Sequence, residues 1–116
     1  MKINKLSEVE KIKVEMDGAQ NAFKQVPISK KDGTPSYSFR VFTIEPNGFT
    51  PYHNHQFEHI NYIIQGKGAL KNEAGEEFPL ESGDFALVEQ NEKHQYINKS
   101  EDSDFVMICA VPKEYE

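Results

Sequence analysis

The stretch PYHNHQFEHINYIIQG, residues 51–66, decides the fold and carries three of the four histidines in the chain. These are His53, His55 and His59, and many of their neighbours are β-branched or aromatic residues typical of strands. Residues two apart on a strand point to the same face about 6.6 Å apart, so His53 and His55 can bind one ion. A lone histidine on a strand is usually an ordinary polar or core residue, but three so close together favour a metal site.

His59 can join the pair only if the chain turns. A straight strand would carry it about 13 Å beyond His55, which is too far for a shared ion. We therefore expect a tight turn near Gln56–Phe57 and a second strand that returns alongside the first. The remaining histidine, His94, lies in GDFALVEQNEKHQYIN, residues 83–98, so a four-histidine site requires the fold to bring two separate stretches together.

The rest of the chain predicts short strands separated by turns. The first of them should end at Pro46-Asn47-Gly48, and a hairpin is expected around residues 73–75. The segments that read as strands are YSFRVFTIEP, HINYIIQG, KGALKN, EEFPLE, FALVE, HQYIN and DFVMICAV. Short strands at this spacing, with no long helix, indicate an all-β sandwich or barrel. Residues 1–22 are charged and could form a short strand, a frayed arm or an arm packed on a second subunit.

Length and charge limit the possible functions. The chain has 116 residues, enough for one domain, and carries 13 basic and 19 acidic residues, a formal net charge of −6. This balance argues against nucleic-acid or membrane-surface binding, because both favour a basic face. The N-terminus lacks the apolar stretch of a signal peptide and no apolar run could span a membrane, so we expect a cytoplasmic protein. The single Cys109 cannot form an internal disulfide.

The first histidine stretch resembles the first motif of the cupin family. In that motif a glycine precedes a His-x-His pair, a glutamate and a closing glycine. Gly48, His53, His55 and Gly66 occupy these positions, and His59 stands where the family usually has the glutamate. The gap between Gly48 and His53 is one residue shorter than usual.

The second stretch resembles the second cupin motif. Gly83, His94 and Asn98 lie in register with it, while Glu89 replaces a proline and Asn91 replaces a glycine. Asparagine also tolerates the left-handed backbone that glycine usually supplies there, so the second change is mild. Both motifs together place every histidine of the chain on a metal-ligand position of the family.

The resemblance covers residues 37–111 and is strongest to small single-domain cupins with an all-histidine HxHxxEH site that binds manganese. It implies an all-β, single-domain cupin, a small antiparallel β-barrel or jelly roll, spanning residues 1–116, with residues 1–22 as an N-terminal arm and 37–111 as the core barrel. Small cupins commonly pair, so we expect a homodimer to which the arm contributes. The implied cofactor is one divalent transition metal per chain (Mn, Fe, Zn, Ni or Cu), and its implied ligands are His53, His55, His59 and His94.

Three functions remain open from the sequence. The first is a metal-dependent oxygenase or oxidase acting on a small organic substrate, the second a non-redox isomerase or lyase, and the third a non-catalytic module that binds a metal or small ligand. Four neutral imidazoles would leave the +2 charge of the ion uncompensated, which favours an anionic ligand. Because each ligand must be neutral, metal affinity should fall below about pH 6.

Other residues receive mainly structural interpretations. Glu58 is the rival to His59 as fourth ligand, but strand alternation points it to the other face. Cys109 is expected to be a buried core residue or part of a cavity wall. Tyr52, Tyr62 and Tyr96 are expected to pack, and the predicted core of the first strand consists of Phe39, Val41, Phe42 and Ile44.

Overall fold

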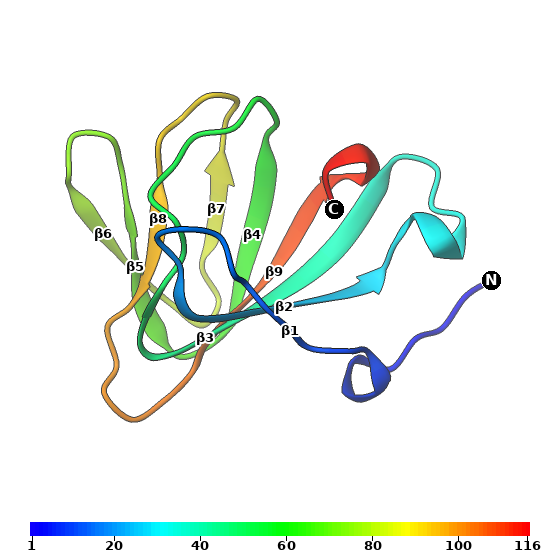
Figure 1. Cartoon of the computed structure of the whole chain (residues 1–116), viewed down its shortest axis with the longest axis horizontal. Helices are drawn as coiled ribbons and strands as arrows, with labels where there is room; N and C mark the ends of the chain where they lie inside the picture. Colours follow the sequence, from blue (N-terminus) through cyan, green and yellow to red (C-terminus); the bar gives the residue numbers. More distant parts are fainter.

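The computed structural model describes all residues 1–116 and contains nine strands in one curled, antiparallel sheet (Figure 1). Along the sheet the strands run β6-β5-β8-β3-β9-β4-β7, with β2 beside β3 and β1 beside β2. Their bounds are β1 Ile12–Lys13, β2 Gln20–Ile28, β3 Tyr37–Phe49, β4 His59–Gln65, β5 Lys67–Lys71, β6 Glu77–Glu81, β7 Phe85–Val88, β8 Gln95–Asn98 and β9 Phe105–Pro112. The three helices, at Leu6–Glu8, Lys30–Asp32 and Lys113–Tyr115, are single 3-10 turns, and none could cross a membrane. The predicted all-β class is confirmed.

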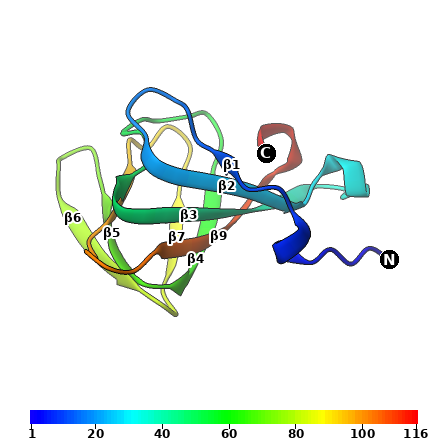
Figure 2. The same ribbon diagram turned by 60° about the horizontal axis from the view of Figure 1, so that its bottom comes forward.

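The long strand β3 joins the two sides of the sheet. Its first part, residues 37–44, pairs with β9, whereas Phe49 at its end pairs with Ile97 of β8. Figures 1 and 2 show β5, β6 and β8 on one side and β4, β7 and β9 on the other. The strand was predicted to end at Pro46-Asn47-Gly48, and this was wrong. Instead, the register against β2 shifts there and Asn47 adopts a φ of 65°, so the strand bulges, bends and continues.

The sequence also failed to predict β2. This strand pairs with β3 along most of its length, but it mixes polar residues with Pro27 and shows no clean alternation. The N-terminal segment packs on the same chain, because the side-chain amide of Gln25 donates hydrogen bonds to the carbonyl oxygens of Leu6 (2.9 Å) and Val9 (3.0 Å). Residues 12–13 add β1 to the edge of β2, so the charged arm includes a short strand.

The core lies inside the curled sheet. Its central cluster comprises Ala22, Ile44, Ile63, Tyr96, Phe105 and Met107. Of the four core residues predicted on β3, Val41 and Ile44 are buried and Phe42 is partly buried against the cluster. Phe39 is 43% exposed, so its assignment to the core was wrong. Strand alternation turns Phe39 to the outer face of the sheet, away from Phe42 and Ile44.

Two glycines with the same backbone conformation offer a direct test of packing around the first motif. Gly66 has a φ of 86°, and a Cβ there would lie 2.2 Å from the carbonyl oxygen of Asp104. Gly75 has a φ of 84° with no atom within 4 Å of its Cβ position. We expect Gly75→Ala to lower the free energy of unfolding by about 1–2 kcal/mol, the backbone penalty alone. Gly66→Ala should cost more than about 3 kcal/mol, because the clash adds to that penalty. Urea unfolding checks both values, and equal losses would contradict the packing described here.

Candidate metal centre

The histidines come from three segments around one end of the sheet. His53 and His55 lie between β3 and β4, His59 begins β4, and His94 immediately precedes β8. A regular strand was predicted for the first arm of this stretch, but only an isolated bridge between His53 and His94 forms. It consists of two backbone hydrogen bonds, of 3.2 Å and 2.9 Å. The chain bends at residues 56–57, where the turn was expected.

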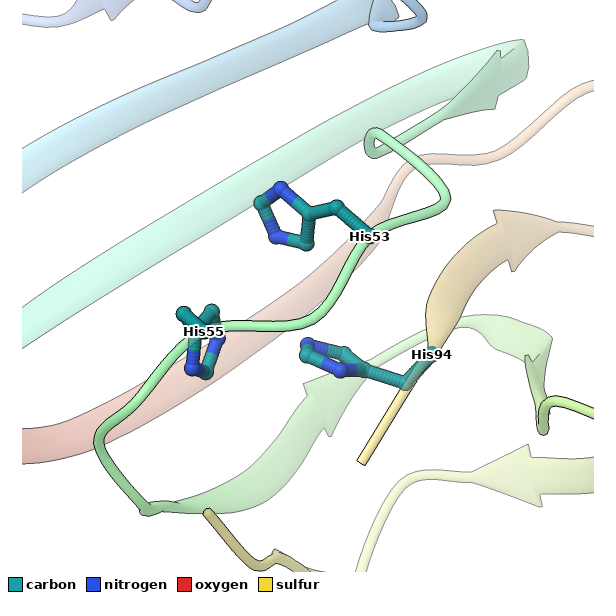
Figure 3. A group of neighbouring side chains, drawn as sticks. All are labelled: His53, His55 and His94. Carbon is teal, nitrogen blue, oxygen red and sulfur yellow. The ribbon is translucent and has the colours of Figure 1, made fainter. Parts of the chain in front are cut away.

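The side chains converge from these segments. The potential ligand nitrogens of His53, His55 and His94 all lie within 4.8 Å of one another, and Figure 3 shows the three rings around a common space. His59 lies outside this mutually close set but packs against two of its members, with ring centroids 5.1 Å from those of His55 and His94. Its Nε2 is 3.3 Å from Nε2 of His94. The fold therefore brings together all four predicted residues, with His53, His55 and His94 as the tightest group.

Backbone carbonyls fix the tautomers of two rings. Nδ1 of His55 lies 2.7 Å from the carbonyl oxygen of Phe57, and Nδ1 of His94 lies 2.8 Å from that of Glu92. Because a carbonyl oxygen only accepts hydrogen bonds, each Nδ1 carries the proton and donates it. Each Nε2 therefore presents a lone pair, which is the form that binds a metal.

A buried amide orients the third ring. Nδ1 of His59 lies 2.6 Å from Oδ1 of Asn61, and the same oxygen accepts a hydrogen bond of 2.8 Å from the Tyr96 hydroxyl. With its Nδ1 proton donated to Asn61, His59 also turns an Nε2 lone pair toward His94. Two lone pairs 3.3 Å apart repel unless a cation lies between them. Two nitrogens bound to one ion at about 2.1 Å would lie roughly 3.0–3.4 Å apart, so the donor set fits a metal ion.

Burial keeps the imidazoles neutral. It is the main cause that lowers the pKa of His59 to about 3 and that of His94 to about 4. Burial also lowers the pKa values of His53 and His55, and the charge of Arg40 adds to the effect on His55 and His59. All four rings are thus neutral at pH 7, as metal binding requires.

A cavity of about 540 Å³ adjoins the histidines. Phe42 and Met107 provide apolar wall, and Cys109 is both fully buried and part of this wall. Burial raises the pKa of the Cys109 thiol, so it stays protonated at neutral pH. Glu58, the rival fourth ligand, is not among the residues that line the cavity.

Sequence reasoning missed three features of the site. Asn61 and Arg40 both lie on inward-facing positions of strands. The sequence offers one signal for them: each is a polar residue two positions away from residues that face the core. The third is a stack of aromatic rings. The ring centroid of Phe57 lies 3.9 Å from that of His55 and 4.3 Å from that of Tyr115. No signal in the sequence links Tyr115 near the C-terminus to residues 55–57.

The chain is similar in sequence and in structure to known proteins. The chain is 30% identical over 82 residues to L-ectoine synthase of Mycobacterium sp. (strain KMS), a match that covers 70% of this chain and 64% of that protein. The chain thus spans less than two thirds of the length of this curated relative. Among solved structures, the polyketide cyclase RemF from Streptomyces resistomycificus is 24% identical with a TM-score of 0.90, over 97% of this chain and 80% of that one.

A second solved structure, ectoine synthase from P. lautus, is 21% identical with a TM-score of 0.76, over 97% of this chain and 78% of that one. At such identities the structural similarity establishes the barrel fold alone. The model of the family described as "Cupin domain" matches residues 40–111. This range includes both histidine stretches and more than half of the chain. The chain therefore belongs to the cupin domain family, as its two motifs indicated.

Proposed function

We propose that this protein is a metal-dependent enzyme that catalyses a non-oxidative rearrangement of a small organic substrate, such as a cyclisation, an isomerisation or an elimination. The observation that carries the proposal is the approach of two Nε2 lone pairs, those of His59 and His94, to 3.3 Å. This arrangement calls for a cation, and the adjoining cavity of about 540 Å³ offers room for a substrate beside it.

The proposed ligands of the cation are His53, His55, His59 and His94, which would hold one divalent transition metal per chain. Imidazole suits zinc, copper, nickel and iron, and the resemblance to all-histidine cupins adds manganese. When bound, such an ion acts as a Lewis acid that polarises a substrate oxygen. The proposed donor set contains no carboxylate, so the protein leaves the charge of the ion available to an anionic substrate.

The remaining cavity residues orient and shield the substrate. Asn61 holds the ring of His59 in place through its Oδ1, and the side chains of Phe42 and Met107 exclude water from one wall. Burial raises the pKa values of Tyr96 and Cys109, so both stay protonated and neither accepts a proton at neutral pH. These residues therefore support a reaction driven mainly by electrostatic stabilisation.

Two observations favour a non-oxidative reaction. The relatives are named for synthase and cyclase activities, which form bonds. The cavity wall also contains two oxidisable sulfur atoms, those of Met107 and Cys109, which are poorly suited to a site of oxygen activation. The oxygenase or oxidase is kept as a second candidate, because an all-imidazole site also suits redox-active iron and copper.

The test uses the protein loaded with zinc, which has no redox chemistry. Under nitrogen, this form should convert members of a panel of small keto acids and amino acids, followed as new proton NMR signals. The His94→Ala variant is the control and should show no conversion. Turnover that appears only with iron or copper and consumes dioxygen would instead establish the oxygenase. If a small molecule raises the melting temperature but no metal form turns over, the protein is a binding module.

We further propose that the chain forms a homodimer through the outer face of β3, β9, β4 and β7. Phe39 and Ile60 both pair with Ala110 of β9, and Leu87 pairs with Ile60, so these residues form one row across four strands. Phe85 extends the face, and Phe39, Ile60, Leu87 and Phe85 are all exposed. An apolar face of this extent is typical of a protein–protein contact.

Sedimentation velocity tests the dimer. Leu87→Glu should convert it to a monomer, because the carboxylate would be buried in the interface. Phe78→Glu is the matched control, since Phe78 is also exposed (49%, against 58% for Leu87) but lies on β6, away from this face. A wild-type monomer at micromolar concentration would refute the proposal.

We also propose that residues 1–116 form one domain, because β1 and β2 extend the same sheet as the strands of residues 37–111. Limited proteolysis that released a stable core without residues 1–28 would contradict this. The cytoplasmic location and the lack of a nucleic-acid or membrane partner stay predictions from the sequence.

A further inference from the structure

Arg40 has hydrogen-bond donors that the protein does not satisfy. Its guanidinium offers five N–H groups, yet the only partner is the sulfur of Cys109, 3.1 Å from one terminal nitrogen. Its Nε is buried without any partner, the only such side-chain atom in the structure. A thiol is a weak acceptor, and an unsatisfied buried donor costs free energy. A ligand that accepts these hydrogen bonds would remove that cost.

The charge of Arg40 is also uncompensated. No carboxylate oxygen lies within 4.0 Å of its guanidinium nitrogens. The only salt bridge in the structure joins Lys99 and Glu77. The cavity wall includes two other cations, Lys13 and Lys24, and two acidic residues, Glu15 and Glu116, and of these Lys13 is exposed to solvent.

Glu116 is engaged elsewhere. Its carboxylate accepts hydrogen bonds from the Ser38 hydroxyl and from the backbone N–H of Lys30, and its charge acts on Lys24. Glu15 is exposed to solvent. Of the three cations that line this cavity, Arg40 is the one with a buried donor that has no partner in the protein.

Arg40 also has a suitable position relative to the histidines. It pairs with Cys109 across β3 and β9, which directs both side chains into the barrel, and it lines the same cavity as the four imidazoles. Its guanidinium carbon lies 5.0 Å from the ring centre of Phe42, so the charged group rests on apolar wall. Phe42 and Met107 line the same cavity, so they offer apolar contacts to a ligand held by Arg40.

We propose that Arg40 binds the carboxylate of a small organic acid whose reacting part faces the four histidines. The planar guanidinium matches a carboxylate through two parallel hydrogen bonds, and the apolar wall suits a carbon skeleton. The charged side chains that line the cavity, three cations and two carboxylates, leave a net charge of +1, which favours a monoanionic carboxylate over a phosphate dianion. This inference rests on the proposed function for the reaction at the histidines, but the binding of the carboxylate does not depend on that reaction.

Calorimetry with benzoate tests the proposal on the full chain, in both its zinc-loaded and metal-free forms at pH 7.5. Arg40→Met should weaken benzoate binding at least about tenfold in both forms, because it removes both the positive charge and the two parallel N–H donors of the guanidinium. Arg40→Lys should weaken it less, since it keeps the charge alone. Lys24→Gln is the matched control in the same cavity and should change the affinity by less than about threefold. Benzoate should also raise the melting temperature of the wild type but not of Arg40→Met, whose own thermal unfolding reports whether it is folded.

Three results would overturn the carboxylate site. In the first, Arg40→Met binds benzoate within about twofold of wild type. In the second, neutral benzamide or inorganic phosphate binds the wild type as tightly as benzoate does. In the third, the wild type shows no saturable benzoate binding up to roughly 10 mM. Elemental analysis of the same samples reports on the proposed function separately. A wild type that takes up no metal but binds benzoate through Arg40 would refute the metal enzyme and leave the carboxylate site standing.

Discussion

His59→Ala should lose most of its metal, whereas Glu58→Gln should retain it. The Nε2 of His59 lies 3.3 Å from that of His94, while Glu58 does not line the cavity. Removal of one of four ligands should lower metal affinity by at least about a hundredfold, more than is usual for the loss of a residue that only supports a ligand. The measurement is metal per chain after gel filtration in the presence of a weak chelator.

A third variant sharpens this comparison. His59→Glu introduces the ligand that the cupin motif usually has at this position, so it should recover much of the affinity. It would also reduce the net charge of the loaded site from +2 to +1 and weaken the binding of anions. Metal loss in Glu58→Gln, together with retention in His59→Ala, would replace the four-histidine site by one with three histidines and Glu58.

The metal-free protein should lose stability steeply as the pH falls from about 6.5 to 4. In the unfolded chain a histidine binds its proton near pH 6.5, but in the folded protein burial lowers the pKa of His59 to about 3 and that of His94 to about 4. Within this interval the unfolded state binds more protons, so the free energy of unfolding decreases with decreasing pH. Each of these two histidines contributes up to about 1.4 kcal/mol per pH unit, and the lowered pKa values of His53 and His55 act in the same direction.

Urea unfolding at a series of pH values measures this dependence. His59→Gln removes one of the buried titrating groups and should reduce the slope by up to about 1.4 kcal/mol per pH unit. A slope that is the same in His59→Gln and wild type would show that His59 is not held neutral by the fold. The lowered pKa values also mean that protons should displace the metal at a lower pH than the value of about 6 expected for free imidazoles.

The turn that returns His59 beside His53 and His55 could be predicted from the sequence because its constraints are local. Ligands at positions 53, 55 and 59 can converge only if the chain turns between the last two, and the chain does bend at residues 56–57. Asn91 was likewise expected to tolerate a left-handed backbone, and it has a φ of 65°. Such features follow from a few bond lengths and allowed torsion angles, so they do not depend on the distant parts of the chain.

The features that the sequence did not reveal depend on contacts between distant segments. Both faces of β3 carry aromatic residues, so local alternation could not decide that Phe42 faces the core while Phe39 faces outward. Strand β3 continues beyond the bulge at residues 46–48 because β2 pairs with it at Ile44 and again at Phe49, where β8 also pairs. Arg40 and Asn61 occupy inward positions that a hydrophobic pattern assigns to apolar residues, and only the assembled cavity shows why polar groups are there.

The pairing of β3 with β9 also determines the order in which the barrel can form during synthesis. Arg40 and Cys109 face each other across these strands although 69 residues separate them. Contacts of such long sequence separation form slowly, because a large loop must close before they contribute. A nascent chain cannot cover the inner face of β3 with β9 until residues 105–112 have left the ribosome, so the incomplete chain is exposed to aggregation until then.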